Sequence, residues 1–314
     1  MKRSDEVRRV LRANLLVLGI FAAACYRTPS SMTDSGDPRC LDCNVILISI
    51  DTLRADHLSC YGYPRRTSPE IDRFAKESSV FSQVVSTGGG TLPVHLSMMT
   101  SLPPTVHDVW PRHPTRLAEA RVTLAEELRS RGYATAGFVD SGWMLAKFGF
   151  DQGFDVYDDA GGHFKKILPK AVDWLEEHRR SKFFLFLHTY DVHSAFKRLP
   201  YDSPDPYNDL YTAGYLGPFW GCRQGICASR LLARMNAEMT VGAVKPHEVL
   251  GDRELAYIVA LYDGGINHVD DQIGKILRKI RNLGLERNTI VALTSDHGEE
   301  FLEHGRLLHS QYFE

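Results

Sequence analysis

The chain has 314 residues, of which 43% are hydrophobic and 24% are charged, and its formal net charge is -2. This composition is typical of one large globular domain or two small ones, and the chain is long enough to bury a substantial core. It contains no basic stripe of the kind that nucleic-acid binding requires, so we expect no nucleic-acid partner.

The N-terminus has the three parts of an export signal. A basic segment, residues 1–12, precedes the apolar run ANLLVLGIFAAA, and Cys25 follows directly. The run is too short to span a bilayer comfortably, and its end resembles a bacterial lipobox with Ala22 in place of the usual leucine. We therefore expect residues 1–25 to be a lipoprotein-type signal peptide and residues 26–43 a flexible tether. Lipidated Cys25 would anchor an exported bacterial lipoprotein to a membrane, facing the periplasm or cell exterior; the alternative is a soluble secreted protein cleaved nearby.

Five cysteines follow the signal peptide, in a compartment that would permit disulfides. We expect a local disulfide between Cys222 and Cys227, which could close a small loop. Cys40 and Cys43 have the spacing of a metal-finger or redox pair, and the sequence does not decide between these. Cys60 is expected to be a small apolar residue in the core rather than a reactive thiol.

From residue 45 onward, short β-rich runs alternate with longer helical patterns, which predicts a mostly parallel sheet flanked by helices. Continuous apolar runs, typical of strands buried on both faces, lie at 44–50, 134–139, 183–188 and 289–294. Apolar residues recur every three or four positions from Ile266 to Leu283 and predict a long amphipathic helix. Leu117, Leu124 and Leu128 suggest a shorter helix before Gly132. Residues 199–245 are expected to form an irregular insertion that shapes substrate access.

Chemically active side chains follow three of the predicted strands. Asp51 follows the first, the segment HTYDVH ends the third, and Asp296-His297-Gly298 follows the fourth. In open α/β sheets, ligands bind outside the carboxyl ends of the strands. Two carboxylates and one imidazole suit a divalent ion such as Mn, Zn, Mg or Ca. Asp51, Asp296 and His297 therefore form a candidate metal site.

The stretch TGGGTLPVHLSMMTS, residues 87–101, contains a predicted helix start. Thr91 is a good capping residue, and proline is favoured in a first helical turn. A helix N-terminus that follows glycines also binds anions through its free N–H groups. A metal beside the Thr91 hydroxyl would lower its pKa and make it a nucleophile toward sulfur or phosphorus. His95 lies on the same face of the helix, four residues on.

Five segments in order cover most of residues 44–314. They are NVILISIDTLRADHLSCYGYPRRTSPEIDRFAKESSVF, TLPVHLSMMTSLPPTVHDV, FFLFLHTYDVHSAF, LYDGGINHVDDQIGKIL and TIVALTSDHGEEFLEHG. Together they resemble the sulfatase family of the alkaline phosphatase superfamily. The resemblance implies an α/β fold, an alkaline-phosphatase-like three-layer sandwich with a mostly parallel central sheet. It also implies one metal site, a nucleophile at the head of a helix, and histidines that bind the ester group and protonate the leaving oxygen.

The resemblance assigns the metal site and the nucleophile by position. Asp51, Asp296 and His297 would be metal ligands, and Thr91 would be the nucleophile and also touch the metal. His95 stands where sulfatases have the arginine of their signature.

Three further histidines match positions at which the family contacts its substrate. His188 and His193 match the substrate-binding and acid histidines, without a decision on which does which. His309 falls where relatives place a basic residue that contacts the ester oxygens. The alternative for all three is an ordinary core or surface imidazole.

The chain also departs from the sulfatase pattern. True sulfatases use a formylglycine made from Cys or Ser, which Thr91 cannot become, and Val94 and His95 replace the expected Ser and Arg. Only Asp51 stands at the first motif, where many sulfatases have two aspartates and bind calcium. A threonine nucleophile together with two aspartates and one histidine as metal ligands instead resembles the active sites of other members of the superfamily. These are the phosphoglycerol and phosphoethanolamine transferases and the phosphodiesterases. We therefore expect one divalent ion, Mn, Zn or Ca, with Mg as a further candidate.

The sequence thus predicts a metal-dependent hydrolase of sulfate- or phosphate-ester substrates that forms a covalent adduct on Thr91. The alternatives are a phosphodiesterase or phospho-group transferase of the same superfamily, and a non-catalytic lipoprotein that retains the fold. Glu314 ends the chain within or just after the last motif, whereas relatives continue. We therefore expect the catalytic domain, residues 44–314, to lack its C-terminal subdomain and to have an unpaired sheet edge with exposed apolar faces.

Overall fold

The computed structural model describes residues 40, 42–111, 114–194, 199–217, 219 and 250–309. One compact unit begins at Asp42, close to the expected domain start at residue 44. The expected signal peptide, nearly all of the tether, and the Cys222–Cys227 pair lie outside the described residues.

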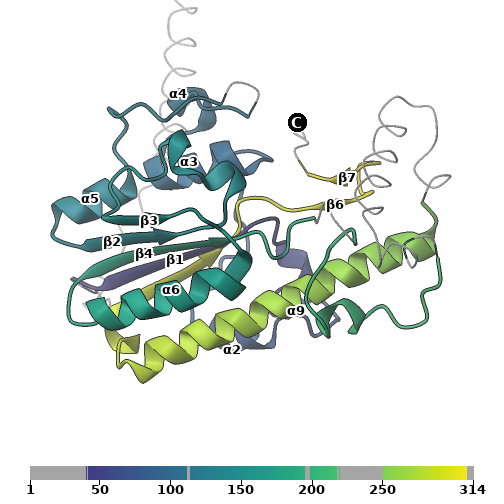
Figure 1. The fold of residues 1–314 in the computed structure, drawn as a ribbon. Helices are drawn as coiled ribbons and strands as arrows, with labels where there is room; N and C mark the ends of the chain where they lie inside the picture. The colour runs from purple at the N-terminus through teal and green to yellow at the C-terminus, as the bar shows by residue number, and fades with distance from the viewer. Residues whose placement is uncertain are drawn as a thin grey trace, which may run out of the picture. The chain divides into compact units, whose positions relative to one another are not determined.

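A five-stranded parallel sheet forms the centre of the fold, in the order β3-β2-β4-β1-β5 (Figure 1). Its strands are β1 (Asn44–Ile50), β2 (Ala134–Phe138), β3 (Val156–Asp158), β4 (Phe183–Thr189) and β5 (Thr289–Thr294). All pairings are parallel, so every strand has its carboxyl end at the same edge of the sheet. The four predicted strands are confirmed to within one residue at each end. β3 was not predicted.

The described α-helices are α2 (Pro69–Ala75), α3 (Thr91–Thr100), α4 (Pro104–His107), α5 (Leu124–Ser130), α6 (His163–His178) and α9 (Asp252–Asn282). Short 3-10 helices lie at Ala55–His57, Ser59–Tyr61, Gly142–Met144, Ala146–Phe148, Tyr207–Asp209 and Glu286–Asn288. A small antiparallel ribbon of β6 (Glu300–Phe301) and β7 (Leu307–Leu308) follows the sheet.

Two hydrophobic cores lie on the two faces of the sheet, and β4 contributes to both. Phe183, Leu185 and Leu187 pack in the core with α2, α6 and α9. Phe184 and Phe186 point the other way and pack with α3 and α5. Figure 1 shows the two helix layers on opposite sides of the sheet. The expected three-layer α/β sandwich is therefore confirmed, and the continuous apolar sequence of β4 follows from its burial on both faces.

Two helix predictions need correction. The long helix is confirmed from Ile266 but begins much earlier, at Asp252, and runs to Asn282. The short helix does not include Leu117, because Thr123 and Glu126 form a reciprocal capping box that starts α5 at Leu124. Leu117 is instead buried outside any helix, in the core below α3.

β5 forms one edge of the sheet, and apolar side chains are exposed beside it. Ile290 of β5 is 50% exposed, and Val84 and Val85, which are 72% and 90% exposed, line the same groove as Ile290. Among the described residues no strand pairs with the outer side of β5, and the expected lack of a C-terminal subdomain stays a prediction. None of the described helices has the length and apolar character needed to cross a membrane.

The structure describes three of the cysteines and the first part of the expected insertion. Cys40 and Cys43 are both disulfide-bonded. Cys60 is a free thiol that is half-buried and packs against the core, and burial raises its pKa. Residues 199–217 contain one 3-10 turn that packs on α9, which agrees with an irregular insertion.

Candidate active site

The carboxyl ends of β1 and β5 bring the three predicted metal ligands together. Asp51 follows β1 and Asp296 and His297 follow β5, and the two strands are neighbours in the sheet. One ligand atom from each of the three residues lies within 4.8 Å of the others. All three side chains are buried.

The hydrogen bonds of this trio leave suitable atoms for a cation. Asp51 Oδ1, Asp296 Oδ2 and His297 Nε2 are buried and have no hydrogen-bond partner among the described residues. His297 Nδ1 lies 3.0 Å from the Gly298 carbonyl oxygen, which can only accept, so Nδ1 carries the proton. Nε2 then has its lone pair available to a metal. The trio therefore fits a divalent ion.

A second group of possible ligand atoms, from Asp51, His95 and His188, fits less well. His95 Nδ1 donates to the Thr91 carbonyl oxygen at 2.9 Å, and Nε2 accepts from the Ser49 hydroxyl at 2.9 Å. Both nitrogens of His95 are thus occupied, and burial lowers the pKa of this ring. His95 therefore braces the first turn of α3 against β1. Its catalytic role at the position of the sulfatase arginine stays a prediction.

Thr91 lies at the start of α3 but does not cap it. Gly90 is the N-cap residue, and no side chain caps the helix. The Thr91 hydroxyl instead donates to Asp51 Oδ2 at 3.0 Å. The expected capping role was therefore wrong, because a buried carboxylate from β1 takes the hydroxyl's hydrogen bond. The helix position and the proximity of Thr91 to the metal trio agree with the sequence-based expectation.

The buried carboxylates strongly influence each other. Burial raises the pKa of the Asp51 carboxyl, and the neighbouring Asp296 carboxylate raises it further. Burial also opposes the ionisation of Asp296, but His297 and His95 outweigh it and hold the Asp296 pKa below its usual range. A divalent cation between the two carboxylates would offset their repulsion.

The turn after β1 is held in a strained conformation by α9. Thr52 has a φ of 59°, which is unusual for a β-branched residue. The Tyr262 hydroxyl donates to the Thr52 carbonyl oxygen at 2.7 Å and accepts the Arg54 N–H at 2.8 Å. The Thr52 N–H donates to Asp296 Oδ1 at 3.2 Å. Tyr262 thus fixes the turn that presents Asp51, and it lies before the periodic segment from which the long helix was predicted.

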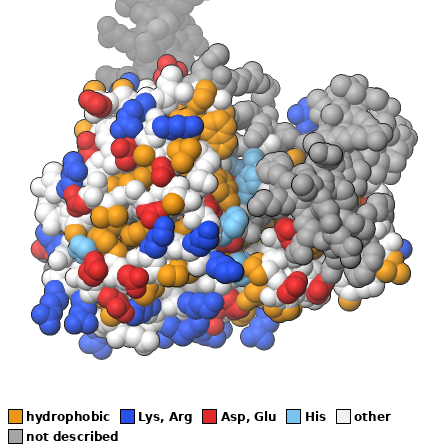
Figure 2. Space-filling view, viewed as in Figure 1, with side chains coloured by type: hydrophobic (Ala, Val, Ile, Leu, Met, Phe, Trp, Pro, Cys, Tyr) orange, Lys and Arg blue, Asp and Glu red, His pale blue; other side chains and the backbone are white. Residues whose placement is uncertain are grey.

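The remaining predicted histidines lie in two places. His188, fully buried, has Nε2 3.4 Å from Asp51 Oδ2, and burial together with His95 lowers its pKa to about 3. His193 and His309 meet with their Nε2 atoms 3.2 Å apart. Burial and His309 lower the His193 pKa to about 4. Figure 2 shows histidine side chains gathered near the middle of the face viewed, beside a strip of hydrophobic side chains.

Tyr190 lies between these two places and was missed by the sequence analysis. Its ring makes edge contacts with His188 and His193, at centroid distances of 4.7 and 5.3 Å. Asp140 accepts the Tyr190 backbone N–H at 2.9 Å and so fixes the end of β4. The two histidine positions are therefore connected through one aromatic ring.

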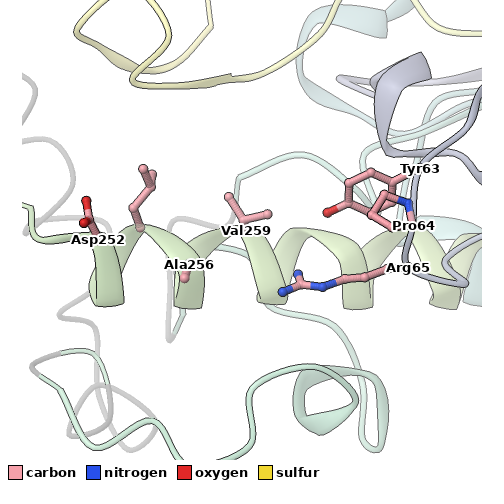
Figure 3. Close-up of a pocket in the computed structure, with 7 residues that line it drawn as sticks. Tyr63, Pro64, Arg65, Asp252, Ala256 and Val259 are labelled. Atoms are coloured by element: carbon pink, nitrogen blue, oxygen red, sulfur yellow. The ribbon is translucent and has the colours of Figure 1, made fainter.

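A separate hollow of about 420 Å³ lies between residues 63–65 and the first turns of α9 (Figure 3). Its described lining is mostly apolar, with Arg65 and Asp252 as its charged members. Arg65 donates to the buried Asp263 at 2.7 Å and so connects the loop to α9. This hollow contains none of the predicted site residues.

The chain is similar to known proteins in sequence and in fold. The family model described as Sulfatase matches residues 43–314. Iduronate 2-sulfatase of Mus musculus is 24% identical over 92% of this chain. The structure is similar to phosphonate monoester hydrolase of Agrobacterium radiobacter, with a TM-score of 0.63 and 19% identity over 87% of this chain and 66% of that one.

A second solved structure is also similar to this chain. The C-terminal periplasmic domain of EcEptC from Escherichia coli, in complex with Zn, has a TM-score of 0.59 and 16% identity over 86% of this chain and 68% of that one. These likenesses confirm the expected alkaline-phosphatase-like fold. The chain spans 60% of the length of the mouse iduronate 2-sulfatase.

Proposed function

Because the chain belongs to the sulfatase family, we propose that it is a metal-dependent hydrolase that cleaves sulfuric or phosphoric esters through a covalent adduct on Thr91. The observation that carries this proposal is the hydrogen bond of 3.0 Å from the Thr91 hydroxyl to Asp51. The Thr91 hydroxyl thus lies at the start of α3 and next to the predicted metal trio, in which three buried atoms have no hydrogen-bond partner within the described part of the chain.

The ion would be held by Asp51, Asp296 and His297. When bound, it supplies positive charge close to the ester oxygens and to the attacking hydroxyl. Asp51 Oδ2 orients the Thr91 hydroxyl and takes its proton as the oxygen attacks sulfur or phosphorus, opposite the leaving alcohol. The free N–H groups at the start of α3 face the charge that develops on the ester oxygens. A histidine, His193 or His309, protonates the leaving alcohol, and water later releases the adduct.

Transfer or hydrolysis of phosphoric esters is the second candidate function. It is favoured by Thr91, since a threonine does not provide the formylglycine of true sulfatases. The solved structures named above include a phosphonate hydrolase, which is consistent with this candidate. We also propose that lipidated Cys25 anchors the protein to a membrane after export, on the basis of the N-terminal sequence.

The test uses the full chain loaded with Mn²⁺ or Zn²⁺, with p-nitrophenyl sulfate and bis-p-nitrophenyl phosphate as substrates. We expect Thr91→Ala to lower kcat by about 1000-fold or more, because it removes the nucleophile. Thr91→Ser keeps a hydroxyl, and Thr87→Ala changes an exposed threonine of the same stretch; both should retain turnover. The ratio of the two wild-type turnover rates assigns the ester class.

Hydrolysis that survives Thr91→Ala would contradict the mechanism. Failure of the wild-type chain to bind any divalent ion, measured by elemental analysis, would instead favour the non-catalytic lipoprotein. Lipid attachment is tested separately, by comparing membrane association and mass of the exported chain with those of Cys25→Ala.

A further inference from the structure

A chain of hydrogen bonds connects His193 and His309 to the buried carboxylate of Glu299. The Nε2 atoms of the two histidines lie 3.2 Å apart, and the rings meet edge to face with centroids 4.6 Å apart. His309 Nδ1 lies 3.2 and 3.4 Å from the two Glu299 carboxylate oxygens. The Glu299 side chain is fully buried, although it forms no part of the predicted metal trio.

The partners at the two ends of this chain set the direction of donation. His193 Nδ1 lies 2.8 Å from the Ser194 carbonyl oxygen, which can only accept, so Nδ1 of His193 donates. Its Nε2 is then available to accept from the Nε2–H of His309. His309 Nδ1 faces carboxylate oxygens and donates to Glu299. Each ring is thus held through Nδ1, and the proton that the two Nε2 atoms share is the one that can pass to the leaving oxygen.

Glu299 itself is held from two further directions. Its backbone carbonyl oxygen accepts from the Arg54 guanidinium at 2.8 Å, and the buried Tyr201 hydroxyl contacts its carboxylate. It also begins the short segment that leads into β6. The carboxylate is therefore rigidly placed, whereas the hydrogen bonds of the His309 ring among the described residues are those to Glu299 and His193.

The His193–His309 pair lies beside the predicted metal trio, since the rings of His309 and His297 have centroids 4.9 Å apart. We propose that Glu299 is a positioning residue that holds both histidines toward the ester group. This inference rests on the proposed function, because only that function gives the pair a substrate to contact. Without the carboxylate, His309 loses its fixed partner, and His193 loses the donor that His309 presents.

The test compares Glu299→Ala and Glu299→Gln with the wild-type chain, with Glu300→Gln as a matched control. Glu300 is the adjacent buried carboxylate, but it accepts from the backbone N–H groups of His304 and Arg306 and contacts neither histidine of the pair. We expect Glu299→Ala to lower kcat for the better ester substrate by about 10- to 100-fold, with a smaller change in KM. Glu299→Gln keeps an acceptor oxygen at the same length and should restore part of the loss. Glu300→Gln should stay within about twofold.

A second measurement does not depend on turnover. Ring ¹⁵N NMR of the metal-free full chain should show His309 protonated at Nδ1, and Glu299→Ala should abolish this fixed protonation, whereas His193 keeps the Nδ1 proton that it donates to the Ser194 carbonyl oxygen. An inactive wild-type chain that still shows the fixed Nδ1 proton of His309, and loses it in Glu299→Ala, would contradict the proposed function but support the role of Glu299. An active wild-type chain whose Glu299 variants match Glu300→Gln in both kcat and ring signals would overturn the inference.

Discussion

Replacing Ser49 by alanine tests whether His95 braces the nucleophile helix or binds the metal. The Ser49 hydroxyl donates to His95 Nε2 at 2.9 Å, and both side chains are fully buried. The variant leaves His95 Nε2 buried and without a donor, and an unsatisfied buried polar atom costs about 1–3 kcal/mol. We therefore expect the free energy of unfolding to fall by about 2 kcal/mol.

Urea unfolding of the metal-free chain in EDTA measures this effect. With an m-value of about 3 kcal/mol per molar, the midpoint should fall by about 0.7 M. Ser78→Ala is the matched control, because the exposed Ser78 hydroxyl donates only to a carbonyl oxygen of its own turn. Its free energy of unfolding should change by less than about 0.5 kcal/mol. The metal content of Ser49→Ala should equal that of wild type.

Two results would refute the bracing argument in different ways. A midpoint for Ser49→Ala no lower than that of Ser78→Ala would show that the buried hydrogen bond does not stabilise the fold. Unchanged stability with altered metal binding would assign His95 to the ligand group of Asp51, His95 and His188 instead.

Two further changes test the packing of α9 against the site and against α2. Burial raises the pKa of Asp270 to about 7, above its unfolded value of 3.8, so its contribution to stability is full below the unfolded pKa and is lost as the pH rises toward 7. The free energy of unfolding of wild type minus that of Asp270→Asn should therefore fall between about pH 4 and pH 7, and a flat difference over this range would contradict this assignment. Tyr262→Phe removes the hydroxyl that holds Thr52 and Arg54, and metal titration should show about tenfold weaker binding. Equal weakening in Tyr211→Phe, whose hydroxyl contacts only the exposed Arg66 carbonyl oxygen, would show that the effect is not specific to the turn.

The strands could be predicted where burial on both faces leaves a continuous apolar sequence. β1 and β5 have the predicted bounds, and β4 exceeds its prediction by one residue. β3 has only three residues at the opposite sheet edge, and its Val156 is 40% exposed, so it carries no comparable apolar run. The predicted strands therefore differ from β3 in the length of their continuous apolar sequence rather than in their β-propensity.

The metal trio could be predicted because its members follow strands that end at one edge of a parallel sheet. The residues that hold this site in place could not. Ser49 lies 46 residues before His95, and Tyr262 lies 210 residues after Thr52. Such contacts depend on the packing of α3 and α9 against the sheet, which no local pattern specifies.

Thr91 shows how tertiary structure overrides a correct local preference. A threonine before a proline-containing first turn favours capping, which would direct its hydroxyl back to the N–H groups of its own helix. The helix instead begins one residue earlier, at the Gly90 cap, and the Thr91 hydroxyl donates to Asp51. The Thr91 carbonyl oxygen meanwhile accepts from His95, one turn later. Because Gly90 needs no side chain to begin the helix, the hydroxyl is available for the metal trio, and the N–H groups at the start of α3 have no side-chain cap to compete with an anionic ester.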